Sequence, residues 1–428
     1  MKLILQVALD FVDLPRALKV AAESISGGAD WIEAGTPLIK SIGLESVREL
    51  RKKFPEHLIV ADMKTMDVGR AEVEIAAKAG ASIISIMAAA SDSTIKDAIR
   101  AANNYGARIM VDLLGVPSIV KRAKEVEKFG ADYLGIHISI DEQMEGKISF
   151  EIVKKLSQET NLPIAVAGGI NSETVVDAIN AGASVVIVGG AITKAENAKI
   201  ATQKIKKAMQ TGKKIPTKLY KRVSEDRVKE ILFLVSTANI SDAMHREGDL
   251  KGIFPLLKGI KIAGRAFTVR TYPGDWAKPV EAVDAANEGD VIVIDAGGVA
   301  PAVWGELATN SCIAKKIAGV VIDGAIRDTG EIRKLNFPAF AKIITPTAGE
   351  PKGFGELSIP VNIGGRKVSP GDWIVGDDDG VVAIPRKEVA EITNRAMDVL
   401  EKENRIRKEI KDGSTLSKIT ELLKWEKK

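Results

Sequence analysis

Three charged residues within one stretch of six could carry acid–base or metal chemistry. Asp62, Lys64 and Asp67 closely follow the apolar run Leu58–Ala61, which predicts a short, buried parallel strand. In a protein interior each charge would have to be paired or neutralised. At the carboxyl end of a barrel strand the three would instead face one pocket, where they could hold a metal ion and move protons. The plainer alternative is a solvated loop with a chance salt bridge.

The elements that must position these residues recur at even spacing through the first half of the chain. Eight short apolar runs alternate with helical patterns in units of about 25 residues, and they predict a (β/α)8 TIM barrel over residues 1–212 rather than an open sheet. The runs are Leu3–Leu9, Trp31–Glu33, Leu58–Ala61, Ile83–Met87, Arg108–Leu114, Tyr133–Ile138, Ile164–Ala167 and Val185–Val188.

Polar residues end most of these predicted strands, so they should meet at the carboxyl face, where barrel enzymes keep their chemistry. They are Asp10, Glu33, Asp62, Lys64, Asp112 and His137. Strands seven and eight end instead in Gly168-Gly169 and Gly189-Gly190. Each Gly-Gly by itself is more often only a tight turn. As a pair in these two loops they let backbone N–H groups approach a phosphate, and they indicate a phosphorylated substrate.

Five motifs follow one another along the first half of the chain. They are Glu33-Ala-Gly-Thr-Pro-Leu-Ile39, Ala61-Asp-Met-Lys-Thr-Met-Asp67, Val111-Asp-Leu-Leu-Gly115, His137-Ile-Ser-Ile-Asp-Glu-Gln143 and Val188-Gly-Gly-Ala-Ile-Thr193. As a set they resemble the 3-hexulose-6-phosphate synthases of the orotidine-monophosphate decarboxylase suprafamily. The whole suprafamily shares the Asp-x-Lys-x-x-Asp spacing. The full sequence Asp-Met-Lys-Thr-Met-Asp and the motif that begins at His137 favour the synthases over their relatives.

The resemblance implies an aldol reaction between ribulose 5-phosphate and formaldehyde that depends on Mg²⁺ or Mn²⁺. Glu33 and Asp62 would then be the metal carboxylates, because Mg²⁺ prefers hard oxygen ligands. His137 is the best candidate for the general base, since imidazole titrates near working pH. Lys64 would polarise the oxyanion of the enediolate that the reaction requires.

The remaining barrel residues receive roles from the same resemblance. Asp67 in this suprafamily reaches the neighbouring subunit's site, which implies a barrel dimer. Asp10 and Asp112 would orient substrate hydroxyls or neighbouring side chains, although Asp112 could equally be a buried structural carboxylate. The direction of the aldol reaction is left open. A sugar-phosphate decarboxylase or epimerase of the same suprafamily is the rival interpretation of the barrel.

A change in composition near residue 213 marks the end of the barrel. A Gly, Pro and Lys cluster without periodicity, Thr211–Lys218, predicts a linker over residues 213–225 between halves that fold separately. Short strands and Gly-rich turns then predict a β/β/α layered domain over residues 226–428, with a charged helical tail from Arg386. Ser241 is a candidate cap for a following helix. The expected strands are Arg265–Arg270, Asp290–Asp295, Gly319–Ile322, Ala339–Ile343, Pro360–Ile363, Trp373–Gly376 and Val381–Ile384.

Two segments of the second half could form another site. Gly297–Ala308 is a Gly-rich loop that opens a helix and can bind a carboxylate or phosphate. Val321–Asp328 is predicted to be a buried strand that ends in Arg327 and Asp328. Arginine offers a two-donor fork for a carboxylate, and aspartate can hold a cation or its water. An internal salt bridge between the two is the plainer alternative.

These segments, above all Ile322-Asp-Gly-Ala-Ile-Arg-Asp328, resemble the RraA-like family, which includes class II 4-hydroxy-4-methyl-2-oxoglutarate aldolases and regulators of ribonuclease E activity. The resemblance implies a small 2-oxoacid ligand and trimers of this domain. The residues it assigns are Arg327 and Glu306 for catalysis, the backbone of Gly305 and Leu307 for binding, and Asp328 for the metal. Because Glu306 stands where the aldolases have aspartate, oxaloacetate decarboxylation is the expected reaction. A regulatory or oligomerising module without chemistry is the alternative.

Composition limits the class of protein. Of 428 residues 45% are hydrophobic and 28% charged, and the net charge is +4 with acids and bases interspersed. These values are typical of globular domains and give no argument for nucleic acid as a partner. The single cysteine, Cys312, excludes an internal disulfide framework and fits a reducing compartment. No apolar run has the length of a membrane span, so a cytoplasmic enzyme is expected.

Overall fold

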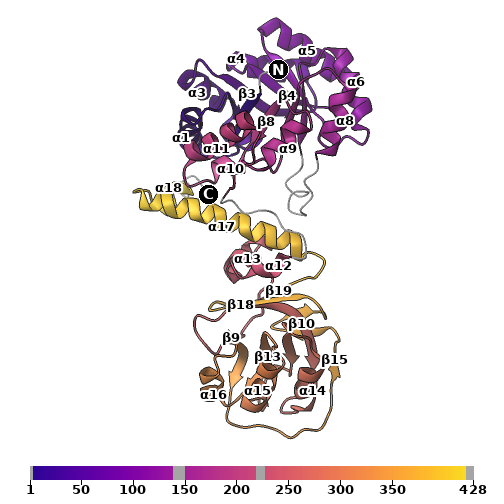
Figure 1. Ribbon diagram of the computed structural model, residues 1–428, viewed down its shortest axis with the longest axis vertical. Coiled ribbons are helices and arrows are strands. Elements are labelled where there is room, and N and C mark those ends of the chain that lie inside the picture. Colours follow the sequence, from indigo (N-terminus) through magenta and orange to yellow (C-terminus); the bar gives the residue numbers. More distant parts are fainter. Residues whose placement is uncertain (1–2, 138–149, 218–226, 421–428) are drawn as a thin grey trace, which may run out of the picture. The chain divides into compact units, whose positions relative to one another are not determined.

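A computed structural model describes residues 3–137, 150–217 and 227–420, which divide into two compact units (Figure 1). The first unit contains residues 3–137 and 150–217 together with 401–420, and the second contains residues 227–400. The boundary between Leu400 and Glu401 falls inside one helix, α17 (Val389–Lys411). The sequence assigned the whole charged tail to the second domain, whereas contacts group its last part with the first unit.

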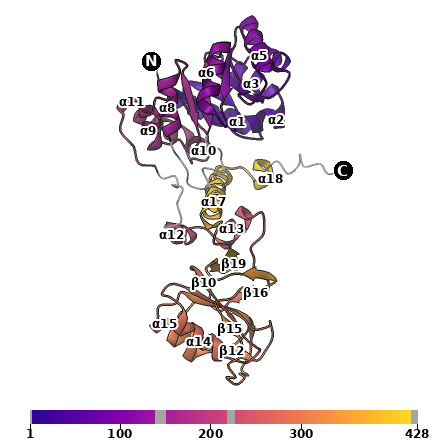
Figure 2. The ribbon, with the colours of Figure 1, turned by 90° about the vertical axis from the view of Figure 1, so that its right-hand side faces the viewer.

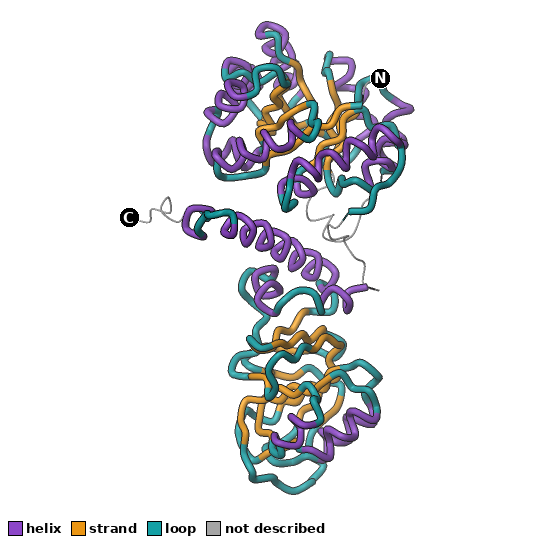
Figure 3. Tube along the Cα trace, turned by 60° about the vertical axis from the view of Figure 1, so that its left-hand side comes forward, coloured by secondary structure: helices purple, strands orange, loops and turns teal. Residues whose placement is uncertain are grey.

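The first unit is a closed barrel of eight parallel strands, arranged in sequence order. Figure 3 draws its strands in orange and its helices in purple. The strands are β1 (Ile4–Leu9), β2 (Trp31–Ala34), β3 (Leu58–Thr65), β4 (Ile83–Met87), β5 (Arg108–Asp112), β6 (Tyr133–His137), β7 (Ile164–Ala167) and β8 (Val185–Val188). Each overlaps one of the eight predicted apolar runs, so the prediction of a (β/α)8 barrel is confirmed.

Helices surround this barrel, and each buries one face against the strands. They are α1 (Leu14–Ser26), α2 (Thr36–Ile42), α3 (Glu45–Lys53), α4 (Gly69–Lys78), α5 (Asp92–Tyr105), α6 (Ile119–Phe129), α8 (Glu151–Glu159), α9 (Thr174–Asn180), α10 (Gly190–Thr193) and α11 (Ala198–Thr211). In α1, Ala17, Val20 and Ala21 are buried, since residues three and four apart share a helix face. Among the helices of the described ranges, none offers the long apolar stretch that crossing a bilayer needs.

Successive residues of each strand alternate between the helix-facing core and the barrel interior. On β1, Leu5, Val7 and Leu9 pack against the helices. A separate interior cluster includes Trp31 and Tyr133, whose rings meet edge to face with centroids 5.5 Å apart. Both residues begin their strands. The amino end of the barrel is therefore a packed core, and the carboxyl ends of the strands are left for polar side chains.

The start of the predicted linker is bound to the first unit. The Ser172 hydroxyl donates to the carbonyl oxygen of Ile215 at 2.7 Å, and the Ile215 N–H donates back to the Ser172 carbonyl at 3.0 Å. The Thr217 N–H donates to the Glu173 carboxylate at 3.0 Å. Most of the predicted linker, residues 218–225, lies outside the described residues.

The second unit is built on a mixed nine-stranded sheet with the main order β19-β18-β10-β11-β13-β14-β9, to which β12 and β15 add at β13 and β10; β16 and β17 pair separately. The strands are β9 (Phe254–Pro255), β10 (Ile262–Arg270), β11 (Val291–Asp295), β12 (Ala302–Trp304), β13 (Gly319–Ile326), β14 (Ala339–Ile344), β15 (Glu356–Leu357), β16 (Val361–Ile363), β17 (Arg366–Val368), β18 (Trp373–Asp377) and β19 (Gly380–Ile384). The helices of this unit are α12 (Val228–Leu232), α13 (Thr237–Ala243), α14 (Ala277–Ala285), α15 (Glu306–Ala314), α16 (Thr329–Lys334) and the first part of α17. The short helix α18 (Leu416–Ile419), which follows α17, belongs to the first unit.

Separate apolar clusters cover the two faces of this sheet, as a layered β and α domain requires. Every predicted strand of the second half is present. The prediction that Ser241 caps a following helix is wrong, because Ser241 lies within α13. Ser236 is the cap: its hydroxyl accepts from the Asn239 N–H at 3.0 Å, while the Asn239 side chain accepts from the Ser236 N–H at 3.2 Å.

Candidate active site

The predicted polar residues of the barrel meet at the carboxyl face because of the strand register. Glu33 on β2 pairs with Ala8 on β1 and with Val60 on β3. Asp10 and Asp62 follow these partners by two residues, so all three carboxylates point to the inside of the barrel. The set that the fold brings to this face is Asp10, Glu33, Asp62, Lys64, Asp112 and His137, from five strands.

Lys64 lies between two carboxylates. Its Nζ donates to Asp112 Oδ2 at 2.9 Å and lies 3.3 Å from Asp62 Oδ2. Burial disfavours the ammonium, but the two carboxylates outweigh burial and raise the pKa of Lys64 above its ordinary value. Lys64 is therefore a fixed cation at neutral pH. It is suited to stabilising negative charge on a substrate oxygen, not to accepting a proton.

A distortion of β3 aims Lys64 into the site. The pairing of β3 with β4 shifts its register between Ala61 and Thr65. Lys64 itself has a φ of 47°, in the left-handed region that residues other than glycine rarely adopt. Its N–H donates to the Ser85 hydroxyl at 3.1 Å. Strain of this kind persists only where the surroundings hold it, and it concentrates at functional sites.

Two hydroxyl residues that the sequence did not single out hold Asp62. The Ser85 hydroxyl donates to Asp62 Oδ1 at 2.6 Å, and the Thr36 hydroxyl donates to Asp62 Oδ2 at 2.6 Å. Ser85 is buried at an inward position of β4, and Thr36 opens α2 directly after β2. A lone serine in the apolar run Ile83–Met87 was the available sequence signal. Both Asp62 oxygens are thus oriented before any ligand binds.

Glu33 is deeply buried, with 6% of the residue exposed. Its Oε2 accepts from the Gln6 amide at 2.5 Å, and Gln6 Oε1 is a buried acceptor with no partner among the described residues. Burial, followed by the charges of Asp62 and Asp10, raises the pKa of Glu33 well above its ordinary value. Burial and then Asp62 likewise raise the pKa of Asp10, against the opposite pull of His137 and Lys64.

These mutually repelling carboxylates suit a divalent cation. Asp10, Glu33 and Asp62 supply the hard oxygen atoms that Mg²⁺ and Mn²⁺ prefer, and a cation among them would favour their ionised forms. Within the described ranges no group of three or more His, Cys, Asp or Glu side chains already stands in ligand geometry. The donor chemistry fits the predicted ligands Glu33 and Asp62, whose side chains would have to close further around an ion.

The two glycine pairs lie in loops at the same face. Gly168 and Gly169 have φ values of 101° and 67°, so the first loop needs glycine at both positions. In the second loop, a Cβ on Gly189 would lie 3.4 Å from Asp10 Oδ2, and Gly190 begins α10. The second loop therefore borders the carboxylate cluster.

The last two predicted barrel residues stand apart from the Lys64 cluster. His137 ends β6 half-buried, and its charge acts on Asp10; the rest of the His137 motif lies outside the described residues. Asp67 is exposed in the loop after β3, where its carboxylate accepts from the Val68 N–H at 2.7 Å. Met66 and Val68 on either side of it are 52% and 63% exposed. The chain itself does not bring Asp67 to the other acids.

The second predicted site is assembled at the end of β13. Asp328 has a left-handed φ of 57°, and its Oδ2 lies 3.5 Å from Arg327 Nε and accepts from the Glu306 N–H at 3.2 Å. A Cβ on Gly305 would lie 2.5 Å from Asp328 Oδ2, so glycine is required there. The Arg327–Asp328 salt bridge is thus present, but its members are 44% and 41% exposed and stay accessible to a ligand.

The other residues of this site point outward or along their own helix. Leu307 is 78% exposed. The Glu306 carboxylate accepts a hydrogen bond from Asn310 one turn later on α15, so it is directed along the helix. The sequence did not single out the contacts of Asp323, which is buried and accepts from Lys342 Nζ at 3.1 Å and from the Gly364 N–H at 2.8 Å. Asp323 therefore ties β13 to the β16–β17 turn.

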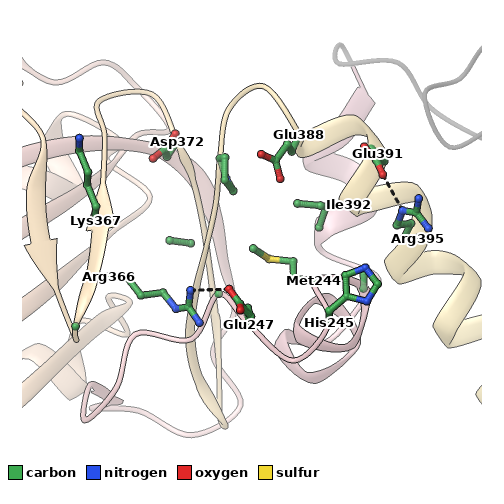
Figure 4. A pocket seen from close by; sticks show the side chains of 15 residues that line it. Met244, His245, Glu247, Arg366, Lys367, Asp372, Glu388, Glu391, Ile392 and Arg395 are labelled. Atoms are coloured by element: carbon green, nitrogen blue, oxygen red, sulfur yellow. Dashed lines mark hydrogen bonds and ion pairs between the residues drawn. The ribbon is translucent and has the colours of Figure 1, made fainter. Parts of the chain in front are cut away.

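A cavity of about 590 Å³ lies elsewhere in the second unit, between α13, β17 to β19 and the start of α17 (Figure 4). Two ion pairs lie among the residues that line it. Arg366 Nη1 donates to Glu247 at 3.2 Å, and Arg395 Nε donates to Glu391 at 2.8 Å. None of the predicted site residues lines this cavity, and we assign it no chemistry.

Comparisons with known proteins match the two halves of the chain to two different families. The family described as Orotidine 5'-phosphate decarboxylase / HUMPS matches residues 4–205, and the RraA-like family, Aldolase/RraA, matches residues 237–383. The chain is 38% identical over 209 residues to the 3-hexulose-6-phosphate synthase of Bacillus subtilis, covering 49% of this chain and 99% of that protein. The same enzyme of Mycobacterium gastri is 36% identical over 205 residues, covering 48% and 99%.

The second half has its own structural relative. The crystal structure of Streptomyces coelicolor RraAS2, an unusual member of the RNase ES inhibitor RraA protein family, is 30% identical, with a TM-score of 0.39, and covers 43% of this chain and 98% of that one. The predicted lyase class agrees with the synthase relatives of the first half. Through its N-terminal half the chain belongs to the Orotidine 5'-phosphate decarboxylase / HUMPS family, and its C-terminal half carries an RraA-like domain.

Proposed function

We propose that the barrel catalyses the aldol addition of formaldehyde to ribulose 5-phosphate, or the reverse cleavage of hexulose 6-phosphate, with a divalent ion held by Glu33 and Asp62. The observation that carries the proposal is the fixed Lys64 cation between Asp62 and Asp112, beside further acids at the open end of the barrel. The synthase relatives, which match the same half over nearly their whole length, support this choice of reaction.

The chain's own groups match the steps of this reaction. A proton next to the keto group of ribulose 5-phosphate must leave to give an enediolate, and His137 is the base at this face that can take it. Lys64 then stabilises the oxyanion without reorganising, because two carboxylates already hold its charge in place. The enediolate carbon attacks formaldehyde, a C–C bond forms, and the new alkoxide takes up a proton.

Further residues bind and orient the reactants. A bound divalent ion would supply Lewis acidity for the substrate oxygens. Asp112 keeps Lys64 in position, and Asp10 is placed to accept from a substrate hydroxyl. The glycine loops after β7 and β8 would receive the phosphate. Asp67 is proposed to serve the site of a second subunit, and the exposed apolar residues Met66 and Val68 beside it support a barrel dimer.

A formaldehyde-consumption assay on the full chain tests this function. With ribulose 5-phosphate and Mg²⁺ we expect formaldehyde to disappear, and with hexulose 6-phosphate we expect it to be released. Full turnover by protein stripped with a chelator would rule out the metal assignment. Release of carbon dioxide from a sugar-phosphate acid, without formaldehyde chemistry, would establish the rival decarboxylase instead.

For the second unit we propose a 2-oxoacid site, in which Arg327 binds the carboxylate and Asp328 holds a divalent cation. The observation in its favour is that the two side chains stand together, half exposed, next to the backbone of Gly305 and Glu306. The Glu306 carboxylate is engaged by Asn310 along α15, which supports decarboxylation of oxaloacetate, a reaction that needs no base to deprotonate a hydroxyl. A regulatory module without chemistry is the outcome if this activity is absent.

A further inference from the structure

The last part of α17 carries a charge that is almost fully buried. Arg405 is 4% exposed, although it lies on a helix whose neighbouring residues are largely charged. Burying a guanidinium is costly unless its donors are paired with good geometry. The hydrogen-bond partners of Arg405 therefore indicate which segment of the chain this residue stabilises.

Those partners lie between β8 and α11, in the short stretch that follows α10. Arg405 Nη1 donates to the carbonyl oxygens of Ala195 and Glu196 at 2.7 and 3.1 Å. Lys408, one turn further along α17, donates to the Glu196 carbonyl at 2.7 Å. These carbonyls connect α10, which begins at Gly190, with α11. Two cations from the far end of the chain thus satisfy backbone acceptors between α10 and α11, at the other end of α10 from Gly189 and Gly190. Figure 2 labels α10, α11 and α17.

A second branch of the same network reaches the loop after β1. Arg405 Nε donates to Glu409 Oε1 at 2.8 Å, and that same oxygen lies 3.2 Å from Nη2 of Arg16 in the first turn of α1. The Arg16 guanidinium in turn lies 5.3 Å from the centre of the Phe11 ring. Phe11 directly follows Asp10 in the sequence.

We propose that Arg405 is a positioning residue of the barrel site, which it shapes through the loops after β8 and β1 rather than by touching substrate. The inference rests on the proposed function, because it assigns these loops to phosphate binding and to Asp10. It means that the catalytic face is completed by residues 401–411, which follow the RraA-like domain in the sequence. The fusion then has a physical consequence: the barrel of residues 1–212 by itself lacks part of its own support.

Substitutions in the full chain test the proposal. Arg405→Met keeps the length and packing of the side chain but removes its donors, and Arg405→Lys keeps the charge without the fork. Arg407→Ala is the matched control, because Arg407 is exposed on the same helix and pairs with Glu403. We expect Arg405→Met to raise KM for ribulose 5-phosphate about tenfold with a smaller change in kcat, because small misplacements weaken binding. Arg405→Lys should recover part of the loss, and the control should match wild type.

Hydrogen exchange of the segment 189–197 gives a readout that does not depend on activity. Arg405→Met should lose protection there, whereas Arg407→Ala should not. A wild type without synthase activity would overturn the proposed function, and the exchange result would still decide whether Arg405 holds the loop. An Arg405→Met protein that loses thermal stability but keeps wild-type KM, or one whose segment 189–197 stays protected, would overturn the inference.

Discussion

The two predicted sites differ in how much of their surroundings their own unit supplies. In the barrel, five strands converge, Glu33 is buried, and Lys64 is fixed by two carboxylates. In the second unit, Arg327 and Asp328 stand at the end of one strand and remain nearly half exposed. Burial and neighbouring charges raise the pKa of Glu33 in the first site, whereas solvent weakens the ion pair of the second.

This difference follows from the two architectures. A closed barrel directs the ends of all its strands to one enclosed face, so side chains far apart in sequence desolvate one another. An open sheet leaves the end of a strand uncovered on one side. In the barrel site, the surrounding side chains can therefore shift one another's pKa values. The second site needs a partner or a ligand to exclude water before its charges interact strongly.

The largest effect is expected from Asp62→Asn. The substitution removes a metal carboxylate and one of the two charges that hold Lys64, so barrel turnover should fall by about 10³-fold. Formaldehyde consumption at saturating Mg²⁺ measures it. Asp97→Asn on the exposed face of α5 is the control and should have wild-type activity. Near-normal turnover by Asp62→Asn would contradict the assignment of Asp62 as a metal ligand and as a partner of Lys64.

Arg327→Ala should affect only the second unit. Without the guanidinium, oxaloacetate decarboxylation should fall on the order of 10²-fold, and Arg327→Lys should recover little because the two-donor fork is lost. Pyruvate formation measures this, with Lys334→Ala on α16 as an exposed control and formaldehyde chemistry unchanged throughout. If wild type shows neither decarboxylation nor thermal protection by pyruvate or oxalate, the second unit is a regulatory module.

Glu33→Gln should make the metal-free protein more stable. A carboxyl group whose pKa is raised on folding lowers the free energy of unfolding when it is ionised. For Glu33 this destabilisation is fully present at pH values above the raised pKa, and it is lost as the pH falls below the ordinary pKa of 4.5. We therefore expect a gain of about 1 kcal/mol at pH 8 that disappears near pH 4. Thermal unfolding across this range measures it, and Mg²⁺ should stabilise wild type more than the variant. A loss of stability at pH 8 would contradict the assigned repulsion.

The smallest effect concerns Cys312, which is fully buried on α15, the helix that begins at Glu306. Burial raises the pKa of its thiol to about 12, so almost no thiolate exists in the folded protein at pH 8. A thiol-reactive dye should not label the native chain and should not alter either activity. In increasing urea, labelling reports when the second unit opens, and comparison with barrel activity shows whether the units unfold separately. Rapid labelling without urea would mean that this site opens locally.

Much of the barrel could be predicted because its pattern is local. Each strand is a short apolar run, and parallel strands in a barrel must end at one face, so Asp10, Glu33 and Asp62 could be placed together without coordinates. The second half was predictable at the level of its main strands. Of its shortest strands, β16 was predicted, whereas β9, β12, β15 and β17 were not, because two or three residues carry no periodicity.

What the sequence determined by itself is therefore the fold class and the residue types at each strand end. The tertiary structure decided the rest, because it depends on contacts between distant segments. The bulge that turns Lys64 between Asp62 and Asp112 requires β4 beside β3, and β5 beside β4 to supply Asp112. The attachment of Arg405 to the loop after β8 joins residues more than 200 positions apart. A charged helix looks solvent-exposed in sequence, and only the fold shows that Arg405 is among its buried charges.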